Sequence, residues 1–81
     1  MIAAQRLSHL VMNEDGFVFD PTTADSFVVN ASALTILQGL QEGRGELEIL
    51  DDLTARFCVT LAEARNDLAD FLSRLKTFQL I

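Results

Sequence analysis

The stretch from Gly16 to Leu40 constrains the fold of this chain more than any other part of the sequence. It begins with two short runs rich in Phe and Val, residues 16–20 and 25–29, and this composition is typical of half-buried strands. The segment between the runs contains Pro21, whose fixed φ and missing N–H favour a turn. We therefore expect a β-hairpin in this part of the chain.

A helix is expected directly after the hairpin. Asn30 ends the strand pattern, and its side chain can accept a hydrogen bond from the amide of Ser32 or Ala33, which would cap a helix. Apolar residues then recur at helical spacing until two glycines interrupt the pattern. The sequence therefore predicts a helix over residues 31–41.

A further strand is expected before the hairpin. Residues 7–12 alternate imperfectly between apolar and polar types. The Asp15-Gly16 dipeptide follows, and Asp-Gly supplies the positive φ that a tight hairpin turn requires. We therefore expect three antiparallel strands in sequential order, a meander, over residues 7–12, 16–20 and 25–29.

Two more helices complete the expected fold. Residues 46–57 carry an apolar stripe and acidic residues in the first turn, which favour the positive end of a helix dipole. Thr60 and Glu63 form a capping-box pattern, in which the hydroxyl caps the Glu63 amide and the carboxylate reaches back to the Thr60 amide; this predicts a helix over residues 61–76. The expected class is α+β, with a three-stranded antiparallel meander followed by three helices in a winged-helix-like order. The final apolar residues are expected to fold back on the core: Phe78, Leu80 and Ile81.

Length and charge limit the classes of function. The 81 residues are expected to form one domain, and a formal charge of −6 opposes binding to nucleic acid and to anionic membranes. No apolar run approaches the roughly 20 residues of a membrane span, and the N-terminus has no run like that of a signal peptide. The single Cys58 cannot form an internal disulfide, which fits the reducing cytoplasm. We expect a small cytoplasmic domain.

The side chains that usually carry catalysis are missing or badly placed. His9 is the only histidine and Cys58 the only cysteine, so there is no Cys/His zinc set. Cys58 lies between Phe57 and Val59 and is expected to be a buried, inert thiol, whereas His9 is expected at the surface. The carboxylate pairs lie on faces expected to be solvated, and none of the glycines forms a phosphate-binding motif. We expect no catalysis and no cofactor, which leaves binding.

The third expected strand offers one mode of binding. In a sequential meander residues 25–29 form an edge strand, and this strand carries no Lys or Pro that would block pairing with another chain. An exposed edge beside a helix forms a groove that an extended peptide can enter as an added strand. The alternative is that the last helix or a second copy covers the edge, and the residues leave both interpretations open.

A winged-helix domain is the alternative function. A DNA-reading helix in the major groove needs outward-facing Lys, Arg, Asn or Gln side chains. Residues 46–57 instead offer Glu46, Glu48, Asp51 and Asp52. The alternative is therefore a regulatory or structural domain that binds a protein partner, with DNA less favoured than protein.

Three segments carry a family resemblance: GFVFDPTTADSFVVNASALTILQGLQEG, EILDDLTARFCV and EARNDLADFLSRLKTFQLI. In this order they resemble the PqqD family, the small peptide chaperones of pyrroloquinoline-quinone biosynthesis and their relatives, the recognition domains for ribosomally made, modified peptides. The resemblance covers roughly Leu7 to Ile81. The matching positions are Asn30, Ala33, Leu37, Leu40, Ile49, Leu53, Phe57, Val59, Asp67, Phe71, Leu72, Leu75 and Leu80.

The resemblance implies a function and partners. Members of this family bind the leader segment of a precursor peptide against the third strand and the last helix, and they present it to a modifying enzyme, commonly a radical S-adenosylmethionine protein. We therefore expect a non-catalytic, cofactor-free peptide chaperone, monomeric or weakly dimeric. Its pathway would be pyrroloquinoline-quinone biosynthesis or that of another modified peptide.

The resemblance also implies a peptide-binding groove. Arg65 would pair with an acidic side chain of the leader, and the alternative is a solvated surface arginine. Leu68 and Leu72 are alternatively core residues. The strand residues carried over by position are Ser26, Phe27, Val28 and Val29, and the helix residues are Arg65, Leu68, Ala69 and Leu72.

Overall fold

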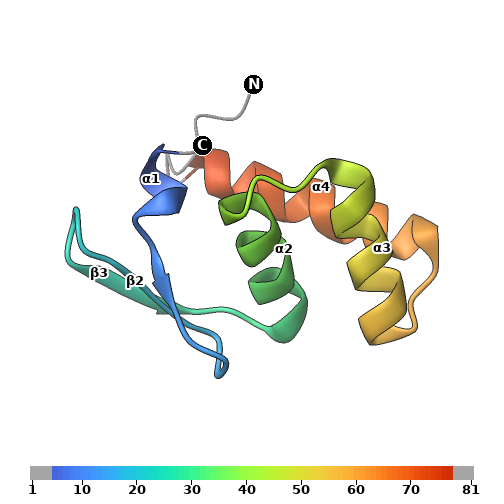
Figure 1. Cartoon of the computed structure of the whole chain (residues 1–81), viewed down its shortest axis with the longest axis horizontal. Helices are drawn as coiled ribbons and strands as arrows, with labels where there is room; N and C mark the ends of the chain where they lie inside the picture. Colours follow the sequence, from blue (N-terminus) through green and yellow to red (C-terminus); the bar gives the residue numbers. More distant parts are fainter. Residues whose placement is uncertain (1–4, 78–81) are drawn as a thin grey trace.

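The computed structural model describes residues 5–77 and shows a small sheet followed by three longer helices (Figure 1). The sheet stands at one end of the molecule, α3 stands at the other end, and α4 runs from α3 back past α2 toward α1 (Figure 1). The three strands are antiparallel in the order β1-β2-β3, so the predicted α+β class is confirmed. The elements are α1 (Gln5–Ser8), β1 (Val11–Met12), β2 (Phe17–Asp20), β3 (Asp25–Val28), α2 (Ala31–Gln41), α3 (Glu46–Phe57) and α4 (Leu61–Thr77).

The hairpin of β2 and β3 forms where the Phe and Val runs predict it. Val18 lies opposite Phe27, and Asp20 lies opposite Asp25. The Asp20 carboxylate accepts a hydrogen bond from the amide of Thr22 at 2.9 Å, which closes the turn as expected. The turn also holds Ala24 at a φ of 61°.

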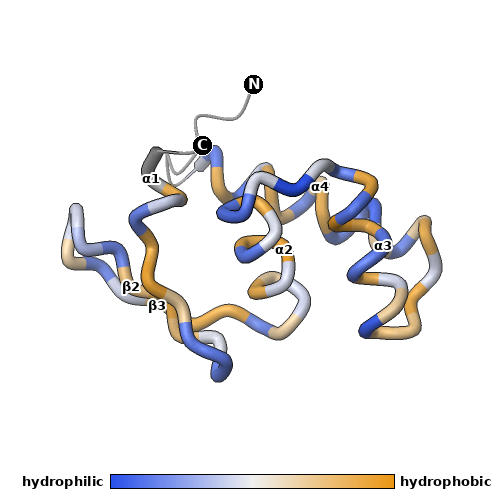
Figure 2. Tube along the Cα trace, viewed as in Figure 1, coloured by the Kyte–Doolittle hydropathy of each residue, from blue (hydrophilic) through white to orange (hydrophobic). Residues whose placement is uncertain are grey.

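The two faces of the sheet differ in what covers them. Val18, on the face toward the helices, is completely buried. Its neighbours along β2 point the opposite way, because side chains alternate along a strand. We call this second face the outer sheet face, and its exposed apolar side chains are Val11, Phe17, Phe19 and Val28. Figure 2 shows apolar stretches along the strands, separated by more hydrophilic turns.

The first strand is much shorter than predicted. The sequence predicts a strand over residues 7–12, whereas Leu7 lies in α1 and only Val11 and Met12 form β1. The reason is burial, since Leu7 and Leu10 are both buried and are three residues apart. A helical turn brings residues at this spacing to one side, whereas a strand would send them to opposite faces. Gln41 secures the turn, because its side-chain amide donates to the Leu7 and Leu10 carbonyls at 2.9 and 2.8 Å.

The core consists of two clusters that meet at α4. The first cluster lies between the sheet and the helices and contains Leu7, Leu10, Val18, Leu37 and Leu75. The second lies among α2, α3 and α4 and contains Ile36, Ile49, Leu50, Leu53, Ala64 and Leu68. Phe71 and Leu72 are half-buried and pack against both clusters. The last helix therefore ties the sheet to the helical layer.

The predicted N-cap of α2 is confirmed, whereas the predicted capping box of α4 forms only in part. The Asn30 side chain accepts a hydrogen bond from the Ala33 amide at 2.9 Å, as predicted. At α4 the Glu63 amide donates to the Thr60 hydroxyl at 3.1 Å, as predicted, but the Glu63 carboxylate accepts from the same hydroxyl and not from the Thr60 amide. A hydroxyl both donates and accepts, so it serves both bonds.

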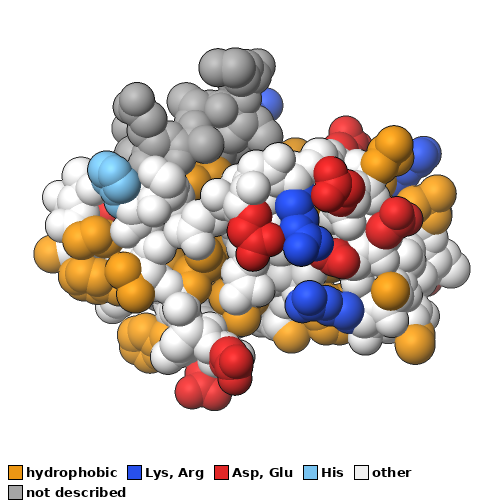
Figure 3. Space-filling model, viewed as in Figure 1, with side chains coloured by type: hydrophobic (Ala, Val, Ile, Leu, Met, Phe, Trp, Pro, Cys, Tyr) orange, Lys and Arg blue, Asp and Glu red, His pale blue; other side chains and the backbone are white. Residues whose placement is uncertain are grey.

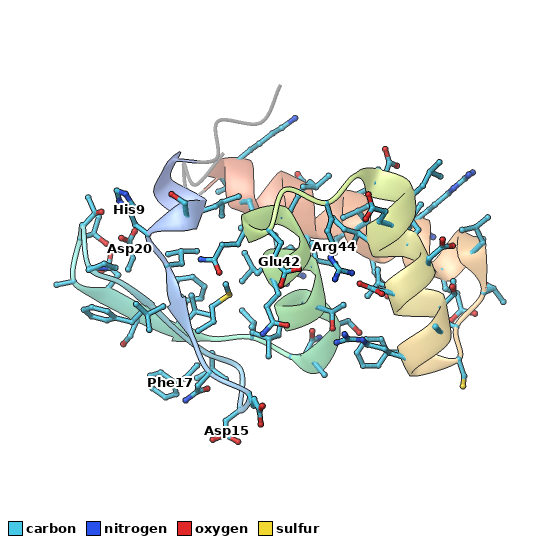
Figure 4. The ribbon with its side chains drawn as sticks, viewed as in Figure 1. His9, Asp15, Phe17, Asp20, Glu42 and Arg44 are labelled. Carbon is cyan, nitrogen blue, oxygen red and sulfur yellow. The ribbon has the colours of Figure 1, made fainter. Side chains whose placement is uncertain are left out.

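An ion-pair network fixes the connection between α2 and α3. The Arg44 guanidinium contacts the Glu42 carboxylate at 2.9 Å and the Asp52 carboxylate at 2.6 Å. Figure 4 shows Arg44 and Glu42 in this connection. The predicted packing of Phe78, Leu80 and Ile81 lies outside the described residues.

The predicted burial of Cys58 is wrong. Cys58 follows α3 in a left-handed conformation, with φ of 52° and ψ of 36°, and its side chain is exposed. Phe57 and Val59 both pack against the second core cluster. The chain reverses at Cys58 to bring both neighbours inward, and the residue between them points outward.

We expect Gly16→Ala to destabilise the protein far more than Gly43→Ala. Both glycines have positive φ, at 87° and 76°. A Cβ at Gly16 would lie 2.2 Å from the Val29 carbonyl oxygen, whereas a Cβ at Gly43 would meet nothing within 4 Å. The expected losses in urea denaturation are about 3 kcal/mol for Gly16→Ala and about 1 kcal/mol for the matched control Gly43→Ala. Equal losses would contradict the close approach of β2 to Val29.

We expect Cys58→Gly to stabilise the protein by about 0.5 kcal/mol, because glycine adopts the left-handed conformation without steric cost. Cys58→Ala is the matched control, since it removes the same thiol but keeps a Cβ at a φ of 52°. Thermal and urea unfolding measure both variants. A gain in the alanine variant as large as that in the glycine variant would show that backbone strain is not the cause.

Candidate functional site

Strand β3 has one unpaired edge. It pairs with β2 on one side, and no other strand among residues 5–77 pairs with it on the other side. The strand reads Asp25-Ser-Phe-Val28 and contains neither of the residues that commonly protect an edge, Lys and Pro. The predicted position of this strand at the edge of the sheet is confirmed.

The register shows which backbone groups of β3 point outward. The Val29 amide donates to the Gly16 carbonyl at 2.9 Å, so these two residues form a hydrogen-bonded pair. Hydrogen-bonded and non-hydrogen-bonded pairs alternate along an antiparallel ladder. Phe27 therefore bonds to β2, whereas the N–H and C=O groups of Ser26 and Val28 point toward the free edge.

Two adjoining hollows lie between this edge and α4. One has a volume of about 460 Å³ and lies toward the tip of the hairpin, and the other has a volume of about 270 Å³ and lies toward the start of α2. We call the two together the β3–α4 groove. Its strand side is residues 25–29, and its helix side is Asp67, Asp70, Phe71, Arg74 and Leu75.

The floor of the groove is apolar and its rim is charged. Phe27 and Phe71 are half-buried and pack against the first core cluster, so their exposed edges form the floor. On the rim, Arg74 lies 3.6 Å from Asp70, and both side chains are mostly exposed. Such an exposed ion pair contributes little to stability, which leaves both charges available to a ligand.

The structure brings together the strand half of the predicted site but not the helix half. Ser26, Phe27, Val28 and Val29 all line the groove. Leu68 is buried in the second core cluster, and Leu72 packs against both clusters, as the alternative reading allowed. Arg65 and Ala69 are exposed on α4 but do not line the groove.

The helix face on the groove has a recognisable spacing. Asp67, Asp70, Phe71 and Arg74 stand at i, i+3, i+4 and i+7, which places them on one side of a helix. The predicted helix wall lies on another side of α4, where Leu68 and Leu72 pack in the core and Arg65 and Ala69 are exposed. The stripe of charged residues interrupted by a single Phe is the signal that could have found the face on the groove.

Other sites are not indicated. His9 is exposed, as expected (Figure 4), and no group of His, Cys, Asp and Glu among residues 5–77 is arranged to hold a metal ion. In the part of the chain that the structure describes, no helix is long and apolar enough to cross a membrane. On the face that Figure 3 shows, hydrophobic side chains gather over the sheet. The groove at the β3 edge is therefore the strongest candidate site.

Comparison with known proteins gave one family match and one structural match. The model of a family described as "Coenzyme PQQ synthesis protein D (PqqD)" matches residues 10–81. A solved structure, "Lasso peptide synthetase B1 complexed with the leader peptide", has the same fold with a TM-score of 0.68 and 23% sequence identity, and the alignment covers 84% of this chain and 81% of that chain. No curated protein sequence matches the chain.

We expect amide hydrogen exchange to alternate along β3. The amides of Ser26 and Val28 point outward, whereas those of Phe27 and Val29 donate to β2 and to Gly16 just before it, so the first pair should exchange at least about tenfold faster. NMR exchange measurements at residue resolution test this. Equal protection of all four amides would mean that another segment or a second copy covers the edge.

Proposed function

The chain belongs to the PqqD family, and we propose that it is a non-catalytic peptide chaperone. It binds the leader segment of a ribosomally made precursor peptide as an added strand on β3, and it presents that peptide to a modifying enzyme. The family model's description makes the pyrroloquinoline-quinone precursor the first peptide to test. The first partner enzyme to test is a radical S-adenosylmethionine protein, which the family resemblance implies.

The free edge of β3 is the observation that carries this proposal. Ser26 and Val28 each offer one unpaired donor and one unpaired acceptor to a neighbouring strand. Main-chain bonds of this kind give affinity for any extended peptide, and pockets for alternate side chains give selectivity. The β3–α4 groove provides such pockets directly beside the edge.

The structural neighbour supports a leader peptide as the ligand, since that synthetase is complexed with its leader peptide. The fold is shared over 84% of this chain. The proposal therefore covers leader peptides of any modified-peptide pathway, with the quinone cofactor as one case. A peptide and a second copy of this chain would compete for the same edge, so the peptide-bound form would not dimerise through β3.

The charges oppose the DNA-binding form of the winged-helix alternative and do not bear on binding to a protein partner. The exposed charged side chains in the first half of α3 are acidic, namely Glu46, Glu48 and Asp51, and the whole chain carries a formal charge of −6. A DNA backbone would be repelled by this surface.

We expect Val28→Pro to abolish peptide binding and leave the helices intact. The Val28 amide points to the free edge, so proline removes a donor to the peptide without removing a bond to β2. The test is an NMR titration of labelled protein with the leader segment of any precursor peptide encoded nearby, with circular dichroism reporting on the helices.

The matched control is Val28→Thr, which keeps the amide and the branched shape and should leave the Kd within about threefold of the wild-type value. In the wild-type titration, shifts should concentrate on residues 25–29 and on the groove face of α4. An unchanged Kd for Val28→Pro would rule out the added strand.

A further inference from the structure

We infer that the β3–α4 groove selects a cationic segment of the peptide, one that carries a basic and an apolar side chain an even number of residues apart. This inference rests on the proposed function and names the chemistry of the ligand. Two observations support it: the distribution of charge around the free edge of β3, and the difference between the residues that line the two hollows.

None of the three strands or the turns between them carries a basic residue. From Leu7 to Gly43 the sequence contains no Lys and no Arg. The described Lys and Arg side chains come from the helical half and from the connection before α3, as Figure 3 shows for one face. The strands and turns carry only acidic charges, on Glu14, Asp15, Asp20 and Asp25. A peptide that approaches β3 therefore meets a field that attracts cations.

The helix side of the groove adds to this field. Asp67 and Asp70 line the hollow near the start of α2, and Arg74 is the one basic residue on the groove lining. Arg74 contacts Asp70, whereas Asp67 has no ion pair with any residue that the structure describes. Asp25 and the buried Asp20 line the other hollow, so four acidic residues and one basic residue line the groove.

The two hollows differ in what they can hold. The hollow toward the hairpin tip has Phe27, Phe71 and Leu75 in its lining and suits an apolar side chain. The hollow toward α2 has Asp67 and Asp70 and suits a Lys or Arg side chain, which carboxylates bind by charge-assisted hydrogen bonds. Arg74 also lines this hollow but lies against Asp70, so an acidic side chain there would meet the carboxylate of Asp67, which has no ion pair among the described residues.

The strand geometry fixes the spacing. Only alternate side chains of an added strand point toward α4, and the others point to the side of the outer sheet face. A side chain in the apolar hollow and one in the acidic hollow are therefore separated by an even number of positions. Their order along the peptide reports whether the added strand runs parallel or antiparallel to β3.

The experiment selects binders from a random library of peptides of about ten residues, a length typical of a long strand. The wild-type protein should enrich Lys or Arg together with an apolar residue two or four positions away. Asp67→Lys combined with Asp70→Lys should weaken the best basic peptide by about tenfold or more and should favour its Glu-substituted counterpart. Glu46→Lys combined with Asp51→Lys makes the same change in net charge on α3, outside the groove, and should change the affinity less than about twofold.

Val28→Pro separates this inference from the proposed function. If selected peptides bind the wild-type protein and lose affinity for Val28→Pro, yet show no basic preference, the inference is wrong and the added strand stands. The same conclusion follows if the groove variant and the control variant weaken basic peptides equally. If the selected peptides bind Val28→Pro as well as the wild-type protein, the proposed function is wrong.

Discussion

The hydrogen bond between the Val29 amide and the Gly16 carbonyl sets the geometry on which the rest of the structure depends. It closes the hairpin ladder at the point where the chain leaves β3 for α2. It also fixes which residues of β3 form hydrogen bonds to β2 and which face the free edge. A slip by one residue would turn Phe27 to the outer sheet face and Ser26 toward the core. The same slip would exchange the amides that face the free edge. One backbone contact thus determines both the packing of the sheet and the recognition edge.

Helix α4 couples the core to the groove. Phe71 packs against both core clusters and also lines both hollows, so the floor of the groove is part of the hydrophobic core. A side chain in this position is held by its neighbours, and the groove keeps its shape without a ligand. Binding to a preformed groove costs less ordering entropy than binding that must first arrange the side chains.

Local patterns predicted most of the fold. The hairpin, the Asn30 cap and the helices follow from strand composition, capping and apolar periodicity, all of which act between near neighbours in the sequence. The incorrect predictions arise where contacts between distant parts of the chain determine the local conformation. Leu7 and Leu10 form a helical turn because both side chains pack in the core. Cys58 is exposed because its neighbours Phe57 and Val59 both pack against the second core cluster. The strand side of the groove was predictable from the edge, whereas the face of α4 depends on how that helix is rotated against two clusters.

The shortness of β1 has a consequence for assembly. Sheets that present two long edges can add copies of themselves without limit, which leads to fibres. Here the edge formed by β1 is two residues long, so among the described residues only β3 offers an edge of useful length. Two molecules that meet through β3 use up each other's edge and form a closed, isologous pair. The protein can thus present one unpaired strand edge without forming open-ended chains of added strands.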